Sequence, residues 1–190
     1  MDLSTVDGCE ALAEKIGDRE EKLDILVNNA GIIRRADAVD FTEADWDTVM
    51  DVNLKALFFT TQAFGKALLA RGGHGSVVNI ASLLSFQGGI RVPSYTASKH
   101  GVAGLTKLLA NEWAAKDINV NAIAPGYIAT NNTEALRADP ERNQAILDRI
   151  PAGRWGNAED IAGAAVFLCS PAARYIHGSV LVVDGGWLAR

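Results

Sequence analysis

Apolar runs of strand length alternate with longer amphipathic stretches along most of the chain. The clearest apolar runs are Leu23–Asn29, Gly75–Ser82, Ile118–Pro125 and Ser179–Gly186. Helices are expected between them, at about 5–17, 43–71 with a possible break, 94–116 and 158–169. Strands that alternate with helices in this way indicate an α/β fold built on a parallel sheet.

The strand at Leu23–Asn29 contains consecutive apolar residues, which suits a strand that is covered on both faces and has a neighbour on each side. The strand from Gly75 can supply one neighbour, but only one helix and the fragment MDLS come before Leu23. We therefore expect that the amino-terminal part of the fold is missing, or that another molecule covers this edge. The segment 126–156 is the least regular part of the chain and is expected to form a mobile flap.

Length and charge narrow the classes of function. With 190 residues, of which 48% are hydrophobic, residues 1–190 are expected to form a single domain. The net charge of −5 comes from scattered residues, which argues against binding to nucleic acid or to an anionic membrane surface. No apolar run approaches the roughly 20 residues of a membrane helix. Cys9 and Cys169 fit no metal or redox spacing, so we expect no metal site and a cytoplasmic location.

The stretch VPSYTASKHG, residues 92–101, places Tyr95 and Lys99 four residues apart near the start of an expected helix. Residues with this spacing lie on the same face of a helix, so both side chains can project into one site. A nearby ammonium favours the phenolate, so Lys99 is expected to lower the pKa of Tyr95 from its usual value of about 10. The alternative is an ordinary amphipathic pair, and the motif alone does not decide between the two.

Small or polar residues end three of the expected strands, and these are Asn28 and Asn29, Ser82, and Pro125 with Gly126. Parallel α/β sheets bind ligands at the carboxyl ends of their strands. The hydroxyl of Ser82 can donate a hydrogen bond to a carbonyl oxygen, and Gly31 lets a ligand approach the backbone. The sequence therefore predicts a crevice at this edge of the sheet.

Several motifs follow one another in a fixed order along the chain. They are NNAG at 28–31, VNL with Asn53, Ser82 followed thirteen residues later by YTASK, PG at 125–126 with Thr130 after it, and VDGG at 183–186. Together they resemble the short-chain dehydrogenase/reductase family over the whole chain. The resemblance implies a Rossmann-like, three-layer fold with a parallel sheet.

The resemblance also implies roles for individual residues. Tyr95 would be the general acid/base, and Lys99 would lower its pKa and bind the nicotinamide ribose. Ser82 would orient and polarise the substrate oxygen. Asn53 would hold a water in a proton relay, although an amide bonded to backbone is the alternative. The expected contacts with NAD, with NADP left open, are Asp2, Asn29, Ala30, Gly31, Tyr95, Lys99, Pro125, Gly126, Ile128 (for which packing alone is the alternative) and Thr130.

One departure from the family concerns the beginning of the chain. Family members begin with a strand, a TGxxxGxG turn and a helix, followed by a second strand whose end selects NAD or NADP, and these elements, on the order of sixty residues, are absent here. An amino-terminal truncation would explain both this absence and the unpartnered strand at Leu23. Because the glycine-rich turn holds the pyrophosphate, we expect this polypeptide to bind a dinucleotide poorly.

The class of substrate is suggested by longer segments, among them SFQGGIRVPSYTASK and RIPAGRWG. They resemble family members that act on sugar acids such as 2-deoxy-D-gluconate or 2-dehydro-3-deoxy-D-gluconate. The planar fork of arginine suits a carboxylate, and Arg91 and Arg154 are the first candidates for this contact. Arg34 and Arg35 are weaker candidates, and a solvated surface arginine is the alternative for each.

Other interpretations stay open on the sequence alone. A 3-oxoacyl carrier-protein reductase or a polyol dehydrogenase of the same family would use the same Ser-Tyr-Lys-Asn site. A catalytically silent, truncated subunit is also compatible with the chain. The resemblance implies a homo-oligomer, most often a tetramer, and the pattern GVAGLTKLLANEW suits helix packing.

Overall fold

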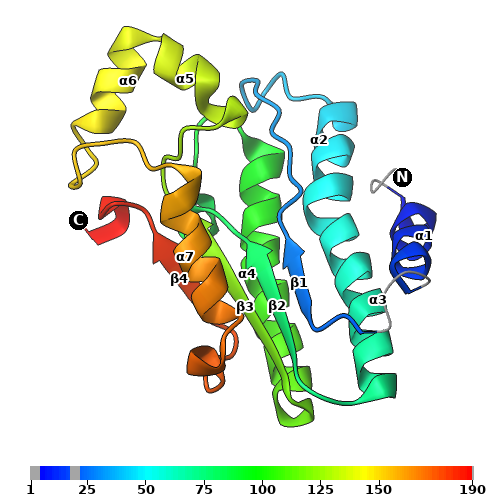
Figure 1. The fold of residues 1–190 in the computed structure, drawn as a ribbon. Helices are drawn as coiled ribbons and strands as arrows, with labels where there is room; N and C mark the ends of the chain where they lie inside the picture. The colour runs from blue at the N-terminus through cyan, green and yellow to red at the C-terminus, as the bar shows by residue number, and fades with distance from the viewer. Residues whose placement is uncertain (1–4, 18–21, 190) are drawn as a thin grey trace.

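The computed structural model describes residues 5–17 and 22–189, whose strands form one parallel sheet in the order β1-β2-β3-β4 (Figure 1). The strands are β1 (Ile25–Asn28), β2 (Gly75–Ile80), β3 (Ile118–Pro125) and β4 (Val180–Val183). The helices are α1 (Val6–Gly17), α2 (Glu43–Met50), α3 (Ala56–Arg71), α4 (Pro93–Trp113), α5 (Glu134–Ala138), α6 (Pro140–Leu147) and α7 (Ala158–Leu168).

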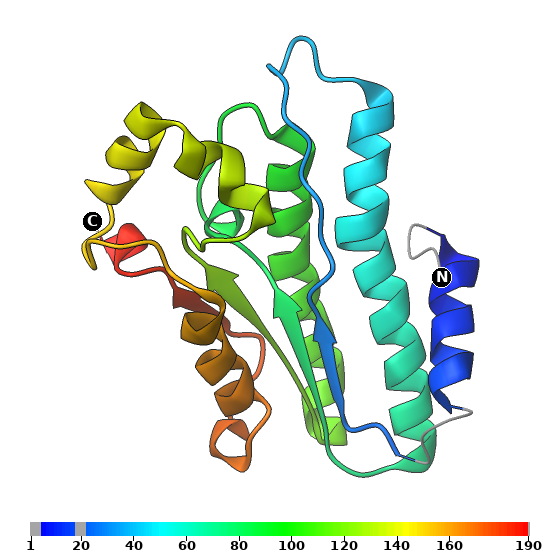
Figure 2. The same cartoon turned by 45° about the horizontal axis from the view of Figure 1, so that its top comes forward.

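Helices cover both faces of the sheet, because alternate side chains of the two central strands point to opposite sides. Val77 and Val120 pack with α3 and α4 on one face, together with Trp113. Val78 and Ile123 pack on the other face, against α7. The three layers and the parallel sheet that the sequence predicts are therefore confirmed (Figure 2).

The crossovers from β2 to β3 and from β3 to β4 advance across the sheet in the same direction. Their helices, α4 and α7, lie on opposite faces, so the two crossovers have opposite hands (Figure 1). About 98% of parallel crossovers are right-handed, so one of these two has the rare hand. An uncommon crossover needs specific contacts that hold it in place.

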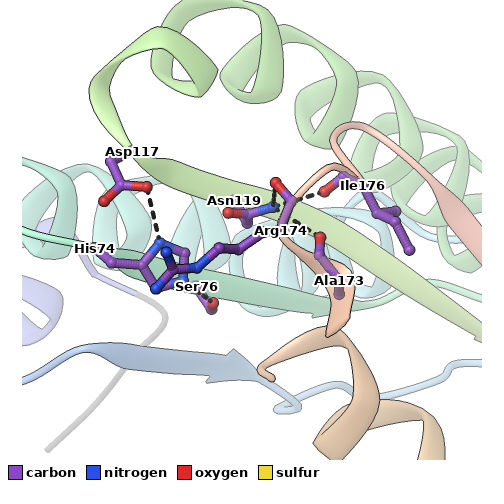
Figure 3. A network of polar contacts seen from close by, with 7 residues as sticks. All are labelled: His74, Ser76, Asp117, Asn119, Ala173, Arg174 and Ile176. Atoms are coloured by element: carbon purple, nitrogen blue, oxygen red, sulfur yellow. Dashed lines mark hydrogen bonds and ion pairs between the residues drawn. The ribbon is translucent and has the colours of Figure 1, made fainter. Parts of the chain in front are cut away.

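Buried asparagines of β3 supply such contacts to the segment between α7 and β4. The side chain of Asn119 donates from Nδ2 to the carbonyl oxygens of Ala173, Arg174 and Ile176, at 3.1, 3.1 and 2.9 Å (Figure 3). Asn121 donates to Ile176 O at 2.7 Å and accepts from Ser179 N at 3.0 Å. These bonds satisfy the two buried amides and hold the segment between α7 and β4 against β3.

A second polar network joins the amino-terminal ends of β2 and β3. His74 contacts Asp117 Oδ1 through Nδ1 at 3.2 Å and the Ser76 hydroxyl through Nε2 at 3.4 Å (Figure 3). The order of the three side chains is that of a hydrolase triad. Ser76 is only 2% exposed, however, and its backbone N–H donates to Asp24 O within the sheet. The network therefore fixes the strand starts and offers no accessible nucleophile.

Most predicted elements lie within a few residues of the observed ones, and Ile118–Pro125 has the predicted bounds. The strand at Leu23–Asn29 was expected to be covered on both faces. In the structure Leu26 packs into the core, but Ile25 and Val27 are 47% and 45% exposed. Residues on the outer face of β1 therefore lack the cover that α7 gives to β2 and β3.

The expected break in the helix at 43–71 and the expected flap both have a definite structure. A π-helical turn at Asp51–Lys55 separates α2 from α3. The segment 126–156 is more regular than expected, because it contains α5 and α6. Asp139 caps α6, since its carboxylate accepts from Glu141 N at 3.0 Å and Arg142 N at 3.1 Å.

We expect Asn119→Ala to lower the free energy of unfolding by about 1–3 kcal/mol, because the buried amide gives up its hydrogen bonds to the segment between α7 and β4. Asn111→Ala, at an exposed position of α4, is the matched control and should change stability by less than about 0.5 kcal/mol. Urea denaturation of both variants measures the difference. Equal stability of the two variants would contradict the role assigned to Asn119.

Candidate functional site

Helix α4 places Tyr95 and Lys99 on its sheet-facing side, one turn apart. The Nζ atom of Lys99 lies 5.5 Å from the centroid of the Tyr95 ring, so the predicted pair is confirmed as a neighbouring pair. Lys99 is 4% exposed, and its Nζ donates to Ile80 O at the end of β2, at 2.6 Å. The ammonium thus lies between the tyrosine and a strand end.

The pKa of Tyr95 is raised in this structure, whereas the sequence led us to expect that Lys99 would lower it. Burial raises the pKa of Tyr95, while its hydrogen bond with Ser82 and the positive charge of Arg35 act in the opposite direction. Burial also lowers the pKa of Lys99 to about 8. Tyr95 is therefore a protonated phenol at neutral pH, the form that can donate a proton to a carbonyl oxygen.

Ser82 and Tyr95 face one cavity of about 460 Å³, which lies at the carboxyl end of the sheet. Pro125 and Gly126, at the end of β3, also line it, as predicted from the strand ends. The rest of the lining comes from the loop after β1, from the segment 83–92, from the segment 127–149 with α5 and α6, and from Trp187 near the carboxyl terminus. A cavity of this size and position suits a small-molecule substrate.

The charged residues that line the cavity are all arginines. They are Arg35, Arg142 and Arg149, and no aspartate or glutamate of the described chain is among the lining residues. This contrasts with the net charge of −5 for the whole sequence. The cavity therefore favours an anionic ligand.

The two arginines first considered for the substrate carboxylate do not line this cavity. Arg91 forms an ion pair with Asp37 at 3.0 Å, and Arg154 holds both carboxylate oxygens of Asp160 at 2.7 and 2.8 Å. The hydrogen bond to Arg154 keeps the pKa of Asp160 well below its usual range. Among the four arginines considered, only Arg35 lines the cavity, and Arg34 pairs with Asp45.

Arg91 has a different, structural function. Its φ of 62° is in the left-handed region, which is uncommon for a residue other than glycine. Its carbonyl oxygen accepts from Ala36 N at 3.1 Å, so it ties the loop after β2 to the loop after β1. Residues of both loops line the cavity. Arg91 does not line it, but its hydrogen bond holds the two loops together.

Asn53 lies in the π-helical turn, is 1% exposed, and uses both ends of its amide. Its Oδ1 accepts from Ile32 N at 2.8 Å, and its Nδ2 donates to Ile32 O at 2.9 Å and to the Ser98 hydroxyl at 3.3 Å. The side chain therefore fixes the loop after β1, which is the alternative weighed for this residue. Single π-helical turns are frequent at functional sites, and this one directs Asn53 toward that loop.

The remaining strand-end residues take several positions. A Cβ added at Gly31 would lie 3.5 Å from Asn53 Oδ1 and 3.8 Å from Lys99 Nζ, so the loop passes close to the ammonium. A Cβ at Gly126 would lie 2.5 Å from Asp184 Cα, so only glycine fits there.

The other expected cofactor contacts lie around these glycines in the sequence. Ile128 packs against Gly156, and Thr130 caps the next helical turn. Asn29 and Ala30 are exposed, and Asp2 lies outside the described residues.

A buried chain of hydrogen bonds, which the sequence did not reveal, connects the strand ends to the helices. Asn28 donates to the Thr61 hydroxyl and to Asn79 Oδ1, both at 2.8 Å. Asn79 in turn donates to the Thr106 hydroxyl of α4 at 3.0 Å. The sequence contains one sign of these bonds, because Asn28 and Asn79 are polar residues within strands that are otherwise apolar.

Within the described ranges, no three His, Cys, Asp or Glu side chains gather as the ligands of a metal ion would. No helix of those ranges is long and apolar enough to cross a membrane.

A parallel sheet that ends at a cavity lined by Ser82 and Tyr95, with Lys99 beside Tyr95, defines the nicotinamide-dependent class of short-chain oxidoreductases. The family model described as enoyl-(acyl carrier protein) reductase matches residues 1–188. The chain belongs to the short-chain dehydrogenase/reductase family.

Individual relatives narrow this class. The chain is 60% identical over 189 residues to 2-dehydro-3-deoxy-D-gluconate 5-dehydrogenase of Escherichia coli, covering all of this chain and 75% of the relative. It resembles an NADP-bound structure from Agrobacterium tumefaciens, provisionally described as a 2-deoxy-D-gluconate 3-dehydrogenase (83% identity, TM-score 0.87, 88% of this chain and 68% of the other). Gluconate 5-dehydrogenase of Burkholderia cenocepacia with NADP and tartrate is also similar (38% identity, TM-score 0.96, 100% and 74%).

The buried ammonium of Lys99 should make the stability of the chain depend on pH. The folded chain releases the Lys99 proton near pH 8 and the unfolded chain near 10.5, so the unfolded chain holds more protons between these values. The free energy of unfolding therefore rises with pH through this window, because the folded chain no longer buries a charge above it. A lowering from 10.5 to about 8 corresponds to roughly 3 kcal/mol.

We expect Lys99→Met to raise the free energy of unfolding at pH 7 by about 1–3 kcal/mol and to remove this rise. Urea denaturation on both sides of the window measures both effects. Lys107→Met, at an exposed position of the same helix, is the control. The same pH dependence in both variants would show that burial of the Lys99 ammonium does not lower the stability of the folded chain.

Proposed function

We propose that the protein is an NAD(P)-dependent oxidoreductase that interconverts a hydroxyl group and a ketone on a sugar acid. One observation supports a sugar acid as the substrate. The cavity that holds Ser82 and Tyr95 is lined by three arginines and by no acidic residue of the described chain. The 3-oxoacyl group of a thioester substrate and a neutral polyol carry no negative charge that would match these arginines.

In the proposed reaction Tyr95 transfers the proton at the substrate oxygen. Its raised pKa makes it a donor in the direction of ketone reduction, and it must lose its proton in the direction of alcohol oxidation. Ser82 donates a hydrogen bond to the same oxygen, and Arg35 stabilises negative charge that develops beside Tyr95. Asn53 keeps the loop after β1 in place and is proposed to hold the relay water.

The nicotinamide cofactor would supply or accept the hydride when bound. The described residues fit it at the crevice beside the cavity. The ammonium of Lys99 has three N–H donors, of which Ile80 O takes one, and it lies close to Gly31. Donors remain for a ribose diol. We propose Lys99, the strand-end residues Asn29, Ala30 and Gly31, and Pro125 and Gly126 as its contacts, with Ile128 and Thr130 near by.

The relatives support this choice by what their names say of them. Two are named for dehydrogenation of 2-dehydro-3-deoxy-D-gluconate and gluconate, and the Burkholderia structure holds NADP together with tartrate, a dicarboxylate. We propose NAD as the natural cofactor, with NADP as an alternative that the bound structures favour.

We further propose that the protein is a single-domain homotetramer of the cytoplasm. Trp46 of α2 and Leu108 of α4 are 39% and 46% exposed, and apolar side chains on neighbouring helices suit contact with a second copy. Neither Cys9 nor Cys169 forms a disulfide within the described residues, as in a reducing compartment. Light scattering should give four times the chain mass, and Leu108→Glu should lower it. A monomeric parent chain would contradict the assembly.

The reaction is tested with 2-dehydro-3-deoxy-D-gluconate and NAD+ or NADP+, by following the absorbance of the reduced nicotinamide that forms as the sugar hydroxyl is oxidised. We expect turnover of the sugar acid, and we expect Tyr95→Phe to lower kcat by about 100-fold or more, because the hydroxyl that transfers the proton is lost. Tyr175→Phe, at a tyrosine that is 97% exposed, is the matched control and should leave kcat unchanged.

The same assay includes a 3-hydroxyacyl thioester and an uncharged polyol. A higher kcat/KM for either of these than for the sugar acid would reject the proposed substrate class. Turnover of the sugar acid that survives in Tyr95→Phe would reject the proposed acid/base residue.

A further inference from the structure

One part of the cavity wall comes from two segments far apart in the sequence. Helix α6 lies near the carboxyl-terminal turn (Figure 2), and Arg142 and Ile146 of α6 and Arg149 just after it line the cavity together with Trp187. Ile146, Ile150, Leu83 and Trp187 form one buried apolar cluster. This cluster fixes the position of α6 relative to the carboxyl terminus.

The charges in this part of the wall are not neutralised by the protein. The guanidinium of Arg149 lies 4.0 Å from the centroid of the Trp187 ring, in the geometry of a cation–π contact. Within residues 5–17 and 22–189, neither Arg142 nor Arg149 has a carboxylate within ion-pair distance. By comparison, Arg35 already donates to Asn132 O at 2.9 Å.

Trp187 provides a second, independent sign of a ligand. The residue is 4% exposed, it lines the cavity, and its Nε1 is buried without an acceptor among the described residues. Buried N–H groups are nearly always satisfied, so this donor is suited to an acceptor that a ligand brings. Tyr127 packs against Trp187 with ring centroids 4.5 Å apart, and the charges of Arg142 and Arg149 act on its hydroxyl.

We propose that Arg149, with Arg142, binds the carboxylate of the substrate over the faces of Trp187 and Tyr127, and that the indole N–H of Trp187 donates to the ligand. This inference rests on the proposed function and assigns the carboxylate to a subsite separate from Tyr95. Arg149 is thus a residue that determines specificity and takes no part in proton transfer.

The chemistry of the substrate class requires such a separation. In a 2-dehydro-3-deoxy-D-gluconate 5-dehydrogenase, as the name of the relatives states, the carbon that changes oxidation state is remote from the carboxylate at the other end of the sugar. A single arginine beside Tyr95 would pull the carboxylate toward the reacting oxygen. Arg35, whose charge acts on Tyr95, serves the reacting end, and Arg149 serves the other.

The test measures the binding of D-gluconate and of D-glucitol, an uncharged polyol of the same chain length, by isothermal titration calorimetry. Arg149→Met should weaken gluconate binding by about 10- to 100-fold, because a charge-assisted bond is lost. Glucitol binding should change by less than about twofold. Arg149→Lys should recover part of the gluconate affinity, which separates charge from packing on Trp187.

Two further variants complete the set. Arg174→Met is the matched control, because Arg174 is exposed and lies near the amino-terminal ends of the strands, away from the cavity (Figure 3). It should leave both affinities unchanged. Trp187→Phe keeps an aromatic face but removes the N–H donor, and it should weaken gluconate binding by about threefold to tenfold. In turnover, Arg149→Met should raise KM for the sugar acid and leave kcat within about twofold.

The outcomes distinguish the inference from the proposed function. If the parent chain prefers gluconate and Arg149→Met binds it as tightly as the parent, the carboxylate subsite is wrong while the sugar-acid function stands. Equal weakening of gluconate and glucitol would likewise overturn the subsite, because it would indicate a packing role. If the parent chain shows no preference for gluconate over glucitol, both the function and the subsite are rejected.

Discussion

The hydrogen bonds of Asn79 determine where the reacting side chains lie. Asn79 is fully buried in β2, so its amide must be satisfied by the protein. It accepts from Asn28 of β1 and donates to Thr106 of α4. Thr106 lies two turns after Lys99 on the same face of α4. The bonds therefore set the height and rotation of α4 against two strand ends, which brings Lys99 to Ile80 and Gly31.

The site built on this frame contains a group that opposes folding. The surroundings of Lys99 lower its pKa to about 8, which means that burial disfavours the charged form. A methionine of similar length would pack without this cost. Retaining the lysine makes sense where a donor is needed beside the strand end, and such exchanges of stability for activity are common at functional sites. The same burial keeps Tyr95 protonated, so one dry environment sets the state of both groups.

Much of this arrangement could be predicted from local patterns. The apolar runs located the four strands of the described sheet, because short runs of consecutive apolar residues are typical of strands in a parallel sheet. Strand ends and helical spacing drew attention to Ser82, Tyr95 and Lys99, and their roles followed from the resemblance to the family. The pKa of Tyr95 could not be predicted, since it depends on burial and on Arg35 more than on the neighbouring Lys99. The asparagine bonds and the opposite hands of the two crossovers also depend on tertiary contacts.

The arginines show where sequence proximity misleads. Arg91 is four residues before Tyr95, yet Asp37 takes its guanidinium, and Arg154 is taken by Asp160. Arg149 is 54 positions from Tyr95 and reaches the cavity only because Ile146 and Ile150 pack with Trp187. The anionic end of the site thus depends on the contact between α6 and the carboxyl-terminal turn, and the reacting end depends on α4 and β2. Substitutions in the apolar cluster around Trp187 can therefore move the arginine without moving Tyr95, so the fold allows substrate preference to change while the proton-transfer site is kept.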